Sequence, residues 1–290
     1  MKSATRILAA LLCVLLLLPT VVFAEAQPSL EKQIAQSAEG MSALGGKKGE
    51  LLKDRELFPA GDSVCDWLAI AMALSGTRES YSDYLAELKA HVEDAYAKNG
   101  CLDRNKATEY HRISLTVLAL GGNPTNFGTK PDGSAIDLAE GTYNYARDPG
   151  AQGLNGWIWA LLTLDAGDTE VPADALYSRE DMVNAISVAQ EPDGGFGLIP
   201  GKSDVDITAM AVQALAPYRD QMETEIDAAL SYLSGQLTDT CGYIAYGDEN
   251  AESTAQVILA LCALGIDPET DSRFVKGEHT LLTELSQFRE

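Results

Sequence analysis

The chain has few basic residues and few histidines. Its 290 residues include 21 lysines and arginines against 43 aspartates and glutamates, which gives a formal net charge of -22. Because so negative a protein repels phosphate groups, this composition disfavours nucleic acid and anionic membrane surfaces as partners. A zinc site needs three or four cysteine, histidine or acidic ligands, and His111 with Glu109 falls short of that set. We therefore expect no metal and no other cofactor.

Long apolar runs are missing beyond the N-terminus. There, two basic residues precede an apolar stretch from Ile7 to Leu18, and small residues follow. This pattern is typical of a secretory signal peptide cleaved after Ala24 or Ala26, and the stretch is about half the length that a membrane span requires. Loss of residues 1–24 removes two basic and no acidic residues and leaves a net charge of -24. We expect residues 25–290 to form one domain, secreted or at the cell surface, without a membrane span.

Cysteines are scarce as well. Beyond the N-terminal stretch the chain has Cys65, Cys101, Cys241 and Cys262. Export permits disulfides, but four cysteines allow three complete pairings, and the sequence does not choose among them. Cys262 lies on the apolar face of a predicted helix, which is typical of a buried thiol.

A helical repeat runs through the rest of the chain. Segments that are apolar almost all round alternate with segments whose apolar residues form one stripe, and we expect these to be the inner and outer helices of repeated pairs. The inner segments end at Gly76, Gly121, Gly167, Pro217 and Gly265, at separations of 45, 46, 50 and 48 residues. Such a period is typical of helix pairs that cannot bury their apolar faces alone. The predicted inner helices are 63–74, 106–120, 152–164, 203–216 and 253–264. The predicted outer helices are 29–52, 80–99, 135–145, 179–190, 221–237 and 278–290.

One turn between two of these helices has a distinctive sequence, Gln190-x-x-Asp193-Gly194-Gly195-Phe196-Gly197. A chain that doubles back between helices needs positive φ angles and room for close backbone approach, and glycine supplies both. We expect Phe196 to plug the gap between neighbouring pairs. The run resembles the signature of the prenyltransferase and squalene-oxidase repeat, which builds the α/α toroids of terpenoid cyclases and protein prenyltransferases.

The resemblance implies an all-α fold of the α/α-toroid type, with five complete helix pairs plus a sixth outer helix. Open HEAT-type arrays have a similar period, but the glycine turn and the apolar inner helices favour the closed ring. Because such rings usually have six pairs, we expect the chain to be C-terminally incomplete; the alternative is a ring that closes around a gap. The ring would place Cys65 and Cys101 at the same end of the barrel, which makes them the favoured disulfide pair.

A toroid would bring the N-termini of its parallel inner helices, with the positive ends of their dipoles, to one mouth of a central cavity. A small ligand would bind at that mouth. The three tryptophans of the mouth suit an apolar or ring-shaped compound. We expect Glu109 and Arg112, three residues apart, to form a helix-surface ion pair rather than to clamp a substrate. His111 can equally belong to the core or to the cavity. The expected ligand contacts are Asp66, Trp67, Glu109, His111, Trp157, Trp159, Thr208 and Gln256.

The start of the fourth inner helix carries a candidate catalytic acid. Asp204-Val-Asp206-Ile207 resembles the Asp-x-Asp-Asp motif of class II terpenoid cyclases, in which a buried, protonated carboxylic acid protonates an alkene. The resemblance implies that Asp206 is the acid and Asp204 its neighbour. Ile207 stands where the motif has its last aspartate, so the motif is incomplete.

A structural role for Asp206 is the favoured alternative. Ser203 and Asp206 have the spacing of a capping box, in which the serine side chain caps the first turn of the helix. Two more inner helices begin with the same spacing, which indicates a shared device for starting helices. The corresponding pairs are Ser63 with Asp66 and Ser253 with Gln256.

Asp206-Ile-Thr-Ala-Met-Ala211 is also similar to runs in the helical domain of cobalamin-carrier proteins, which are exported and share the barrel. Their C-terminal β domain, which covers the corrin, has no counterpart here. We therefore expect an exported protein that binds a small molecule of unknown identity, a corrinoid or an apolar compound, at the cavity mouth. The alternatives are a terpenoid-cyclase-like or prenyltransferase-like enzyme using Asp206, and a structural or protein-binding surface module. A sugar-cleaving enzyme with two carboxylates across a groove is a further alternative.

Overall fold

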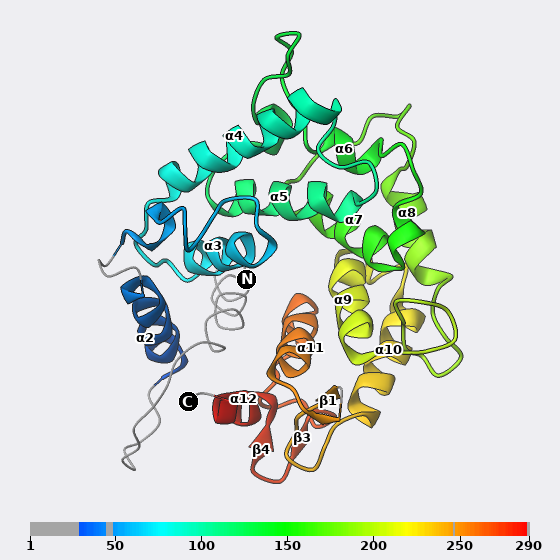
Figure 1. The fold of residues 1–290 in the computed structure, drawn as a ribbon. Coiled ribbons are helices and arrows are strands. Elements are labelled where there is room, and N and C mark those ends of the chain that lie inside the picture. The colour runs from blue at the N-terminus through cyan, green and yellow to red at the C-terminus, as the bar shows by residue number, and fades with distance from the viewer. Residues whose placement is uncertain (1–28, 45–48, 246, 289–290) are drawn as a thin grey trace. The chain divides into compact units, whose positions relative to one another are not determined.

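The computed structural model describes residues 29–44, 49–245 and 247–288 (Figure 1). The predicted signal peptide at 1–24 lies outside these ranges. The chain divides into two compact units. Unit A comprises residues 38–182, and unit B comprises residues from 183 onward together with the first part of α2 (Leu30–Ala43). The ranges described contain eleven α-helices and two short β-hairpins, so the fold is all-α, as the sequence predicted.

Unit A is built around a row of three helices, in which α3 packs against α5 and α5 against α7, while α4 and α6 lie along one side of the row (Figure 1). Three short 3-10 helices join these elements. The α-helices are α3 (Ser63–Leu74), α4 (Tyr81–Asn99), α5 (Ala107–Ala119), α6 (Glu140–Tyr143) and α7 (Asn155–Ala166). The 3-10 helices are η1 (Leu51–Lys53), η2 (Pro124–Asn126) and η3 (Pro149–Gln152).

Local sequence accounts for the ends of two of these helices. The Asp62 side chain accepts hydrogen bonds from the N–H groups of Val64 and Cys65, so it satisfies two donors at the start of α3. Gly100 ends α4 with a φ of 74°, a left-handed conformation that glycine adopts without a steric penalty. Fully buried apolar residues from every helix of the row form the core of unit A, among them Ala69, Ile113 and Leu161.

The predicted outer helix at 135–145 is wrong over most of its length. Only α6 is helical there, and the preceding residues are extended. Thr129 and Ala135 form an antiparallel bridge, and the N–H of Ile136 donates to the Gly128 carbonyl at 3.0 Å. The cause is the turn between them, in which Gly133 has a φ of 89° and its N–H donates to the Lys130 carbonyl at 2.9 Å. This turn draws the following residues into backbone pairing rather than into a helix.

Unit B contains two adjacent helices, α9 and α11, with α10 packed on α9 and α12 packed on α11. Its helices are α9 (Val205–Leu215), α10 (Glu223–Gly235), α11 (Ala251–Ala263) and α12 (Leu281–Leu285), with 3-10 turns η4 (Ala216–Tyr218) and η5 (Ser286–Phe288). Helix α8 (Arg179–Ser187) crosses the boundary between the units. The strands are β1 (Ile244–Ala245), β2 (Asp248–Glu249), β3 (Val275–Lys276) and β4 (His279–Thr280).

Both hairpins of unit B are antiparallel, and the sequence did not predict either of them. Ile244 pairs with Glu249 in the first, and Val275 pairs with Thr280 in the second. The second hairpin occupies the start of the predicted outer helix at 278–290. That prediction is therefore wrong at its start, and the helical part is limited to α12 and η5.

The glycine turn before α9 closes by a backbone hydrogen bond. The N–H of Asp204 donates to the carbonyl of Phe196 at 2.9 Å, and the Phe196 side chain is fully buried. The Gln190 amide holds the turn against α10, because its Nε2 donates to the carbonyls of Gly194 at 2.9 Å and Glu225 at 2.7 Å. The glutamine and the glycines of the signature therefore act together in shaping this turn.

The same turn recurs before α11. There the N–H of Asn250 donates to the carbonyl of Tyr243 at 2.8 Å, and the Tyr243 side chain is fully buried, as Phe196 is. Cys241 has a φ of 64°, which matches the positive φ of 87° at Gly194. This turn lacks the glycine pair of the first, so its sequence does not reveal the similarity.

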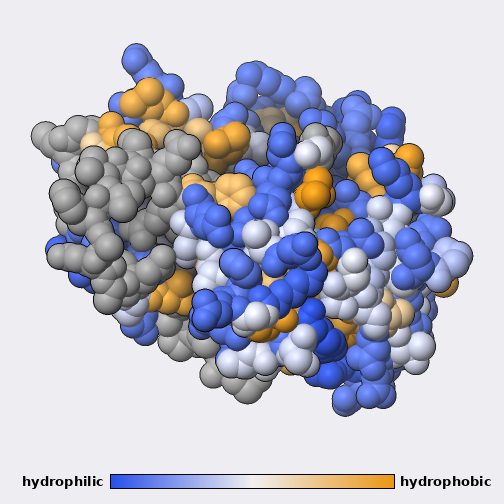
Figure 2. Space-filling view, turned by 90° about the horizontal axis from the view of Figure 1, so that it is seen from below, coloured by the Kyte–Doolittle hydropathy of each residue, from blue (hydrophilic) through white to orange (hydrophobic). Residues whose placement is uncertain are grey.

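The face of the molecule drawn in Figure 2 is mostly hydrophilic where the structure describes it. On the face drawn in Figure 2, hydrophobic residues lie in scattered groups among hydrophilic ones. In the ranges that the structure describes, no helix combines the length and the apolar character needed to cross a membrane. The large apolar side chains with substantial exposure are Leu44, Leu57, Val64, Leu176, Val188, Leu198, Ile199 and Ile244.

Candidate functional site

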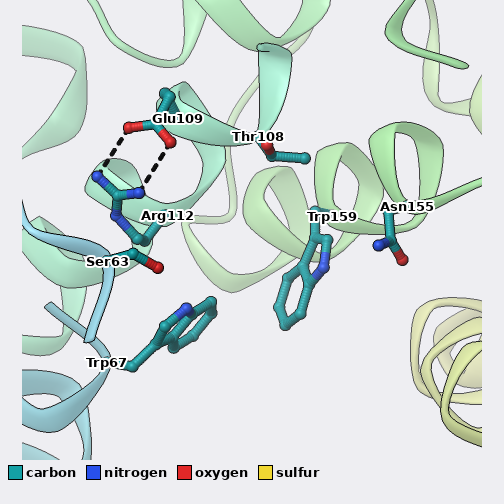
Figure 3. A pocket seen from close by; sticks show the side chains of 7 residues that line it. All are labelled: Ser63, Trp67, Thr108, Glu109, Arg112, Asn155 and Trp159. Carbon is teal, nitrogen blue, oxygen red and sulfur yellow. Dashed lines mark hydrogen bonds and ion pairs between the residues drawn. The ribbon is translucent and has the colours of Figure 1, made fainter. Parts of the chain in front are cut away.

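A pocket in unit A is lined by the first two turns of three helices (Figure 3). Its cavity volume is about 210 Å³. The N-terminal ends of the three helices meet at this pocket, which agrees with the predicted convergence of helix N-termini for these three helices. The lining residues are Ser63 and Trp67 of α3, Thr108, Glu109 and Arg112 of α5, and Asn155 and Trp159 of α7.

Two tryptophans form the apolar part of the pocket. Trp67 reaches in from α3 and Trp159 from α7 (Figure 3). Their ring centroids are 5.1 Å apart, and the ring planes are inclined by 48°. The two rings are therefore in contact and tilted, so they offer a ligand two apolar faces at an angle rather than one flat wall.

Arg112 forms the charged part of the pocket. Its side chain is only 8% exposed. The guanidinium donates to both carboxylate oxygens of Glu109, at 2.9 and 2.8 Å, as Figure 3 shows. It also donates from Nε to Asp66 Oδ2 at 3.0 Å and from Nη2 to the Gly61 carbonyl at 2.9 Å. The predicted Glu109–Arg112 pair is confirmed, but the arginine is buried rather than on the helix surface.

Asp66 lies behind Arg112 and does not line the pocket. It is fully buried and accepts hydrogen bonds from the Tyr84 hydroxyl at 2.7 Å and from the Gly61 N–H at 3.0 Å, besides the ion pair with Arg112. Burial raises the pKa of the Asp66 carboxyl, while its hydrogen bonds and the Arg112 charge act against that rise. Asp66 therefore anchors α4 and α5 to α3, and it would act on a ligand through Arg112.

Several polar side chains on the row of helices have buried atoms without a hydrogen-bond partner, among them Asn155 and His111. Asn155, the first residue of α7, lines the pocket, and its Oδ1 is buried without a donor. His111 is 1% exposed, and neither of its ring nitrogens has a partner. Burial lowers the pKa of the His111 imidazole to about 3, so the ring is neutral at physiological pH. Of its two predicted locations, core or cavity, the structure places His111 in the core.

The other predicted ligand contacts do not line this pocket. Trp157 packs edge-on against Tyr177, with ring centroids 5.1 Å apart. Thr208 and Gln256 belong to unit B. Thr208 is fully buried, and its Oγ1 accepts from the Phe196 N–H at 2.8 Å. Thr208 therefore fastens the glycine turn to α9.

Four pocket residues were not among the expected ligand contacts: Ser63, Thr108, Arg112 and Asn155. A signal for them exists in the sequence. Each helix of the row contributes two lining residues four positions apart, which lie on one face of a helix. The residues four positions before Trp67, Arg112 and Trp159 are the other three lining residues, Ser63, Thr108 and Asn155.

The two candidate catalytic residues, Asp204 and Asp206, occupy the start of α9. Asp204 is the N-cap, and its side chain accepts from the Ile207 N–H at 3.0 Å. Asp206 is the second residue of the helix, and its Oδ1 is buried without a partner. Burial raises the pKa of the Asp206 carboxyl, and the charges of Asp204 and Glu252 act in the same direction while Ser253 opposes the rise.

The predicted capping boxes are therefore wrong. In each case a nearby aspartate or asparagine, not the predicted serine, caps the helix, because its side-chain oxygen accepts hydrogen bonds from the free N–H groups of the first turn. This residue is either next to the serine in the sequence or three positions before it. The actual N-caps are Asp62 of α3, Asp204 of α9 and Asn250 of α11.

Substitutions at Asp204 and Asp206 should separate these two roles. Asp204→Ala is expected to lower the free energy of unfolding by about 1 kcal/mol, because Ile207 N–H loses its acceptor. Asp206→Asn is expected to leave stability unchanged or to raise it at pH 7. Because the pKa of Asp206 is raised in the folded protein, its carboxyl contributes stability at low pH, and this contribution is lost as pH rises. Asparagine does not ionise, so the Asp206→Asn variant does not undergo this loss. Urea unfolding at pH 7 and pH 4 measures both effects. A loss of 1 kcal/mol or more in Asp206→Asn at pH 7 would show that Asp206 does support the helix start.

Unit B contains a carboxyl pair that the sequence did not predict. Glu284 of α12 is 2% exposed and accepts from Gln287 Nε2 at 2.9 Å. Burial and the neighbouring Glu249 raise the pKa of Glu284 to about 7. The side chains of Glu249 and Glu284 both pack against Gly242, and a Cβ atom at that position would lie 2.9 Å from Glu284 Cγ. Among the described residues, no group of three or more cysteine, histidine or acidic side chains is arranged to hold a metal ion.

The favoured disulfide is not formed in the structure. Cys65 and Cys101 are both free thiols, as are Cys241 and Cys262. Cys65 Sγ lies 3.9 Å from the Leu57 carbonyl, whereas Cys101 Sγ lies 3.9 Å from the carbonyl of Asn99. Burial raises the pKa of the Cys65 thiol to about 12, and the Asp62 carboxylate adds to that rise. Cys65 is therefore a protonated, unreactive thiol at neutral pH.

No protein-family model and no curated protein sequence matches the chain. The similarity of the glycine turn to the prenyltransferase and squalene-oxidase repeat therefore stays a prediction.

Proposed function

We propose that this protein binds a small ligand in the pocket at the start of α3, α5 and α7. We further propose that it is an exported member of the α/α-toroid class built from prenyltransferase and squalene-oxidase repeats. The helix pairs, their period and the glycine turn support the toroid assignment. Binding without chemical conversion is the role that the pocket supports best.

One observation carries the binding proposal. The pocket combines a pair of contacting tryptophans with three uncharged polar side chains, Ser63, Thr108 and Asn155. These side chains place hydrogen-bond donors and acceptors beside the apolar rings. Two apolar rings that touch the same cavity favour a molecule with an apolar face. The two features together are typical of a recognition site.

The charges in the pocket favour binding over acid or base catalysis. Both oxygens of Glu109 accept hydrogen bonds from Arg112. Both oxygens of this carboxylate are committed to the bidentate pair, so it is poorly placed to exchange a proton with a ligand. The other ionisable lining residue, Arg112, stays charged at any physiological pH. The pocket therefore lacks a lining side chain suited to proton transfer near neutral pH.

An enzyme using Asp206 is the second candidate, and one observation favours it. Asp206 has a buried oxygen without a partner and a raised pKa, which are the properties of a carboxylic acid that stays protonated. Under that hypothesis, Asp206→Asn abolishes product formation and leaves the melting temperature unchanged. A purely structural or protein-binding role predicts neither turnover nor a response to small molecules.

The melting temperature of the purified exported protein tests the binding proposal. The protein is heated with corrinoids, with polyprenyl compounds and with neutral saccharides, and a shift with one class is expected. A ligand at a hundred times its dissociation constant adds about 2.7 kcal/mol to the free energy of unfolding, which is readily measured. Trp159→Ala should remove the shift, and Trp157→Phe, which changes a ring outside the pocket, should keep it. A cooperative melt that no class shifts would contradict the proposal.

A further inference from the structure

We infer that the ligand of the unit A pocket is a neutral sugar, of which one pyranose ring enters the cavity. This inference rests on the proposed binding function and names the chemical class of the ligand. Three properties of the pocket carry it: its size, the way its charges are already paired, and the position of polar side chains beside an apolar tryptophan surface.

The size of the pocket limits the ligand. Its cavity volume is about 210 Å³, whereas pockets for drug-sized molecules measure about 300 to 1,000 Å³. A molecule of about one six-membered ring with its substituents fits this space. A corrin macrocycle or a long polyprenyl chain does not fit inside it, and only a fragment of either could enter.

The charges of the pocket disfavour an ionic ligand. The carboxylates of Glu109 and Asp66 already balance the positive charge of Arg112, so the pocket offers an anion little net electrostatic attraction. A cation would compete with Arg112 for Glu109, whose two oxygens both accept from the guanidinium. Breaking a buried, bidentate ion pair costs several times more free energy than a contact with an exposed charge at the edge of the pocket returns. A neutral ligand meets neither obstacle.

The remaining lining groups match the two faces of a pyranose. A sugar ring presents C–H groups on its faces and hydroxyls around its edge. The tilted rings of Trp67 and Trp159 can cover the C–H face and one edge, because they meet at 48°. The Asn155 side chain lines the pocket with Trp159, and its amide can exchange hydrogen bonds with the hydroxyls of a sugar. A purely apolar ligand would cover the polar lining groups without replacing their hydrogen bonds to water, which disfavours it.

Two more side chains extend the polar edge of the site. Thr108 and Ser63 line the pocket one turn before Arg112 and Trp67. The Thr108 hydroxyl has a weak contact, at 3.4 Å, with the Gln152 side chain. Hydroxyl groups both donate and accept, as the hydroxyls of a sugar do. Figure 3 shows Thr108 between Glu109 and Trp159, so the polar edge runs beside the aromatic surface.

Titration of the exported protein with neutral monosaccharides tests the inference. Glucose, galactose, mannose and N-acetylglucosamine are each added up to about 50 mM, and binding is followed by tryptophan fluorescence and by calorimetry. At least one is expected to bind, with glucuronate and glucosamine at least tenfold weaker at pH 7. Asn155→Leu and Trp159→Ala should each weaken binding about tenfold or more, since a lost hydrogen bond or stacked ring is worth about a factor of ten. Trp157→Phe should leave the affinity unchanged.

The possible outcomes distinguish a failure of the sugar assignment from a failure of the proposed binding function. Binding of a corrinoid or polyprenyl compound that Trp159→Ala abolishes, without binding of any neutral sugar, would overturn the sugar assignment and keep the pocket as a binding site. Sugar binding that survives both Asn155→Leu and Trp159→Ala would place the sugar elsewhere and overturn the inference. No binding of any class, by a protein that melts cooperatively, would overturn the inference and the proposed function together.

Discussion

Replacing Arg112 by methionine is expected to lower the free energy of unfolding of unit A by about 3 to 5 kcal/mol, because it leaves a buried carboxylate without its partner. Asp66 is fully buried and Arg112 is 8% exposed, so water cannot replace the lost contact. Methionine fills much of the same volume, and the loss therefore reports on charge rather than on packing. Urea unfolding followed by circular dichroism at pH 7 measures it.

The double variant Arg112→Met with Asp66→Asn provides the internal control. Removing both charges should recover most of the lost stability, because no unpaired charge is left. Removing an exposed cation instead, by Lys98→Met at the ion pair with Asp94, should change stability by less than about 1 kcal/mol. A loss below 1 kcal/mol in Arg112→Met alone would show that Asp66 is already protonated in the native protein.

The effect of Arg112→Met should depend on pH in a defined direction. Burial raises the pKa of Asp66, and loss of the Arg112 charge raises it further. A carboxyl whose folded pKa is raised contributes stability that is present at low pH and is lost as pH rises through the folded pKa. The deficit of the variant is therefore expected to be small near pH 4 and to grow toward pH 7.

Replacing Gly194 by alanine is expected to cost unit B about 3 kcal/mol or more. Gly194 has a φ of 87°, and a Cβ at this position would lie 2.6 Å from the carbonyl oxygen of Ala228 on α10. Left-handed backbone costs a residue with a Cβ about 1 to 2 kcal/mol, and a contact this short with backbone must move the turn or the helix. The free energy of unfolding in urea gives the total.

Gly201 offers a matched control in the same loop. Its φ is 85°, nearly that of Gly194, and a Cβ there would have no other heavy atom within 4 Å. Gly201→Ala should therefore show the backbone cost alone, about 1 to 2 kcal/mol. The difference between the two variants measures the close approach of the turn to α10. Equal losses in both would mean that the turn relaxes away from Ala228 without cost.

The sequence predicted long periodic helices well and short extended segments poorly. The predicted helices at 63–74 and 80–99 agree with α3 and α4 within one residue, because their apolar pattern continues over several turns. The segment at 135–145 carries a pattern that fits a helix, but the turn at Gly133 commits its first residues to backbone pairing. The apolar periodicity of a segment indicates which of its faces is buried, but it does not indicate a tight turn that precedes the segment.

The candidate site shows the same limit at the level of single side chains. Trp67, Glu109 and Trp159 were expected to contact a ligand, and all three line the pocket. Asp66 is one position from Trp67 and His111 is two positions from Glu109, yet both are buried and neither lines the pocket. Neighbours on a helix differ by about 100° in direction, so their sequence position cannot decide which of them faces a cavity. Burial by a neighbouring helix, as of Asp66 by the Tyr84 hydroxyl, is a tertiary property.

The recurrence of the glycine turn before α11 also bears on how unit B folds. Each turn closes by a hydrogen bond between its buried aromatic residue and the residue that caps the next helix, Phe196 with Asp204 and Tyr243 with Asn250. Contacts so local in sequence form early and at little entropic cost, and chains built of similar units can nucleate at any of them. Unit B therefore has two equivalent starting points for folding, and a defect in one turn leaves the other able to begin its own helix.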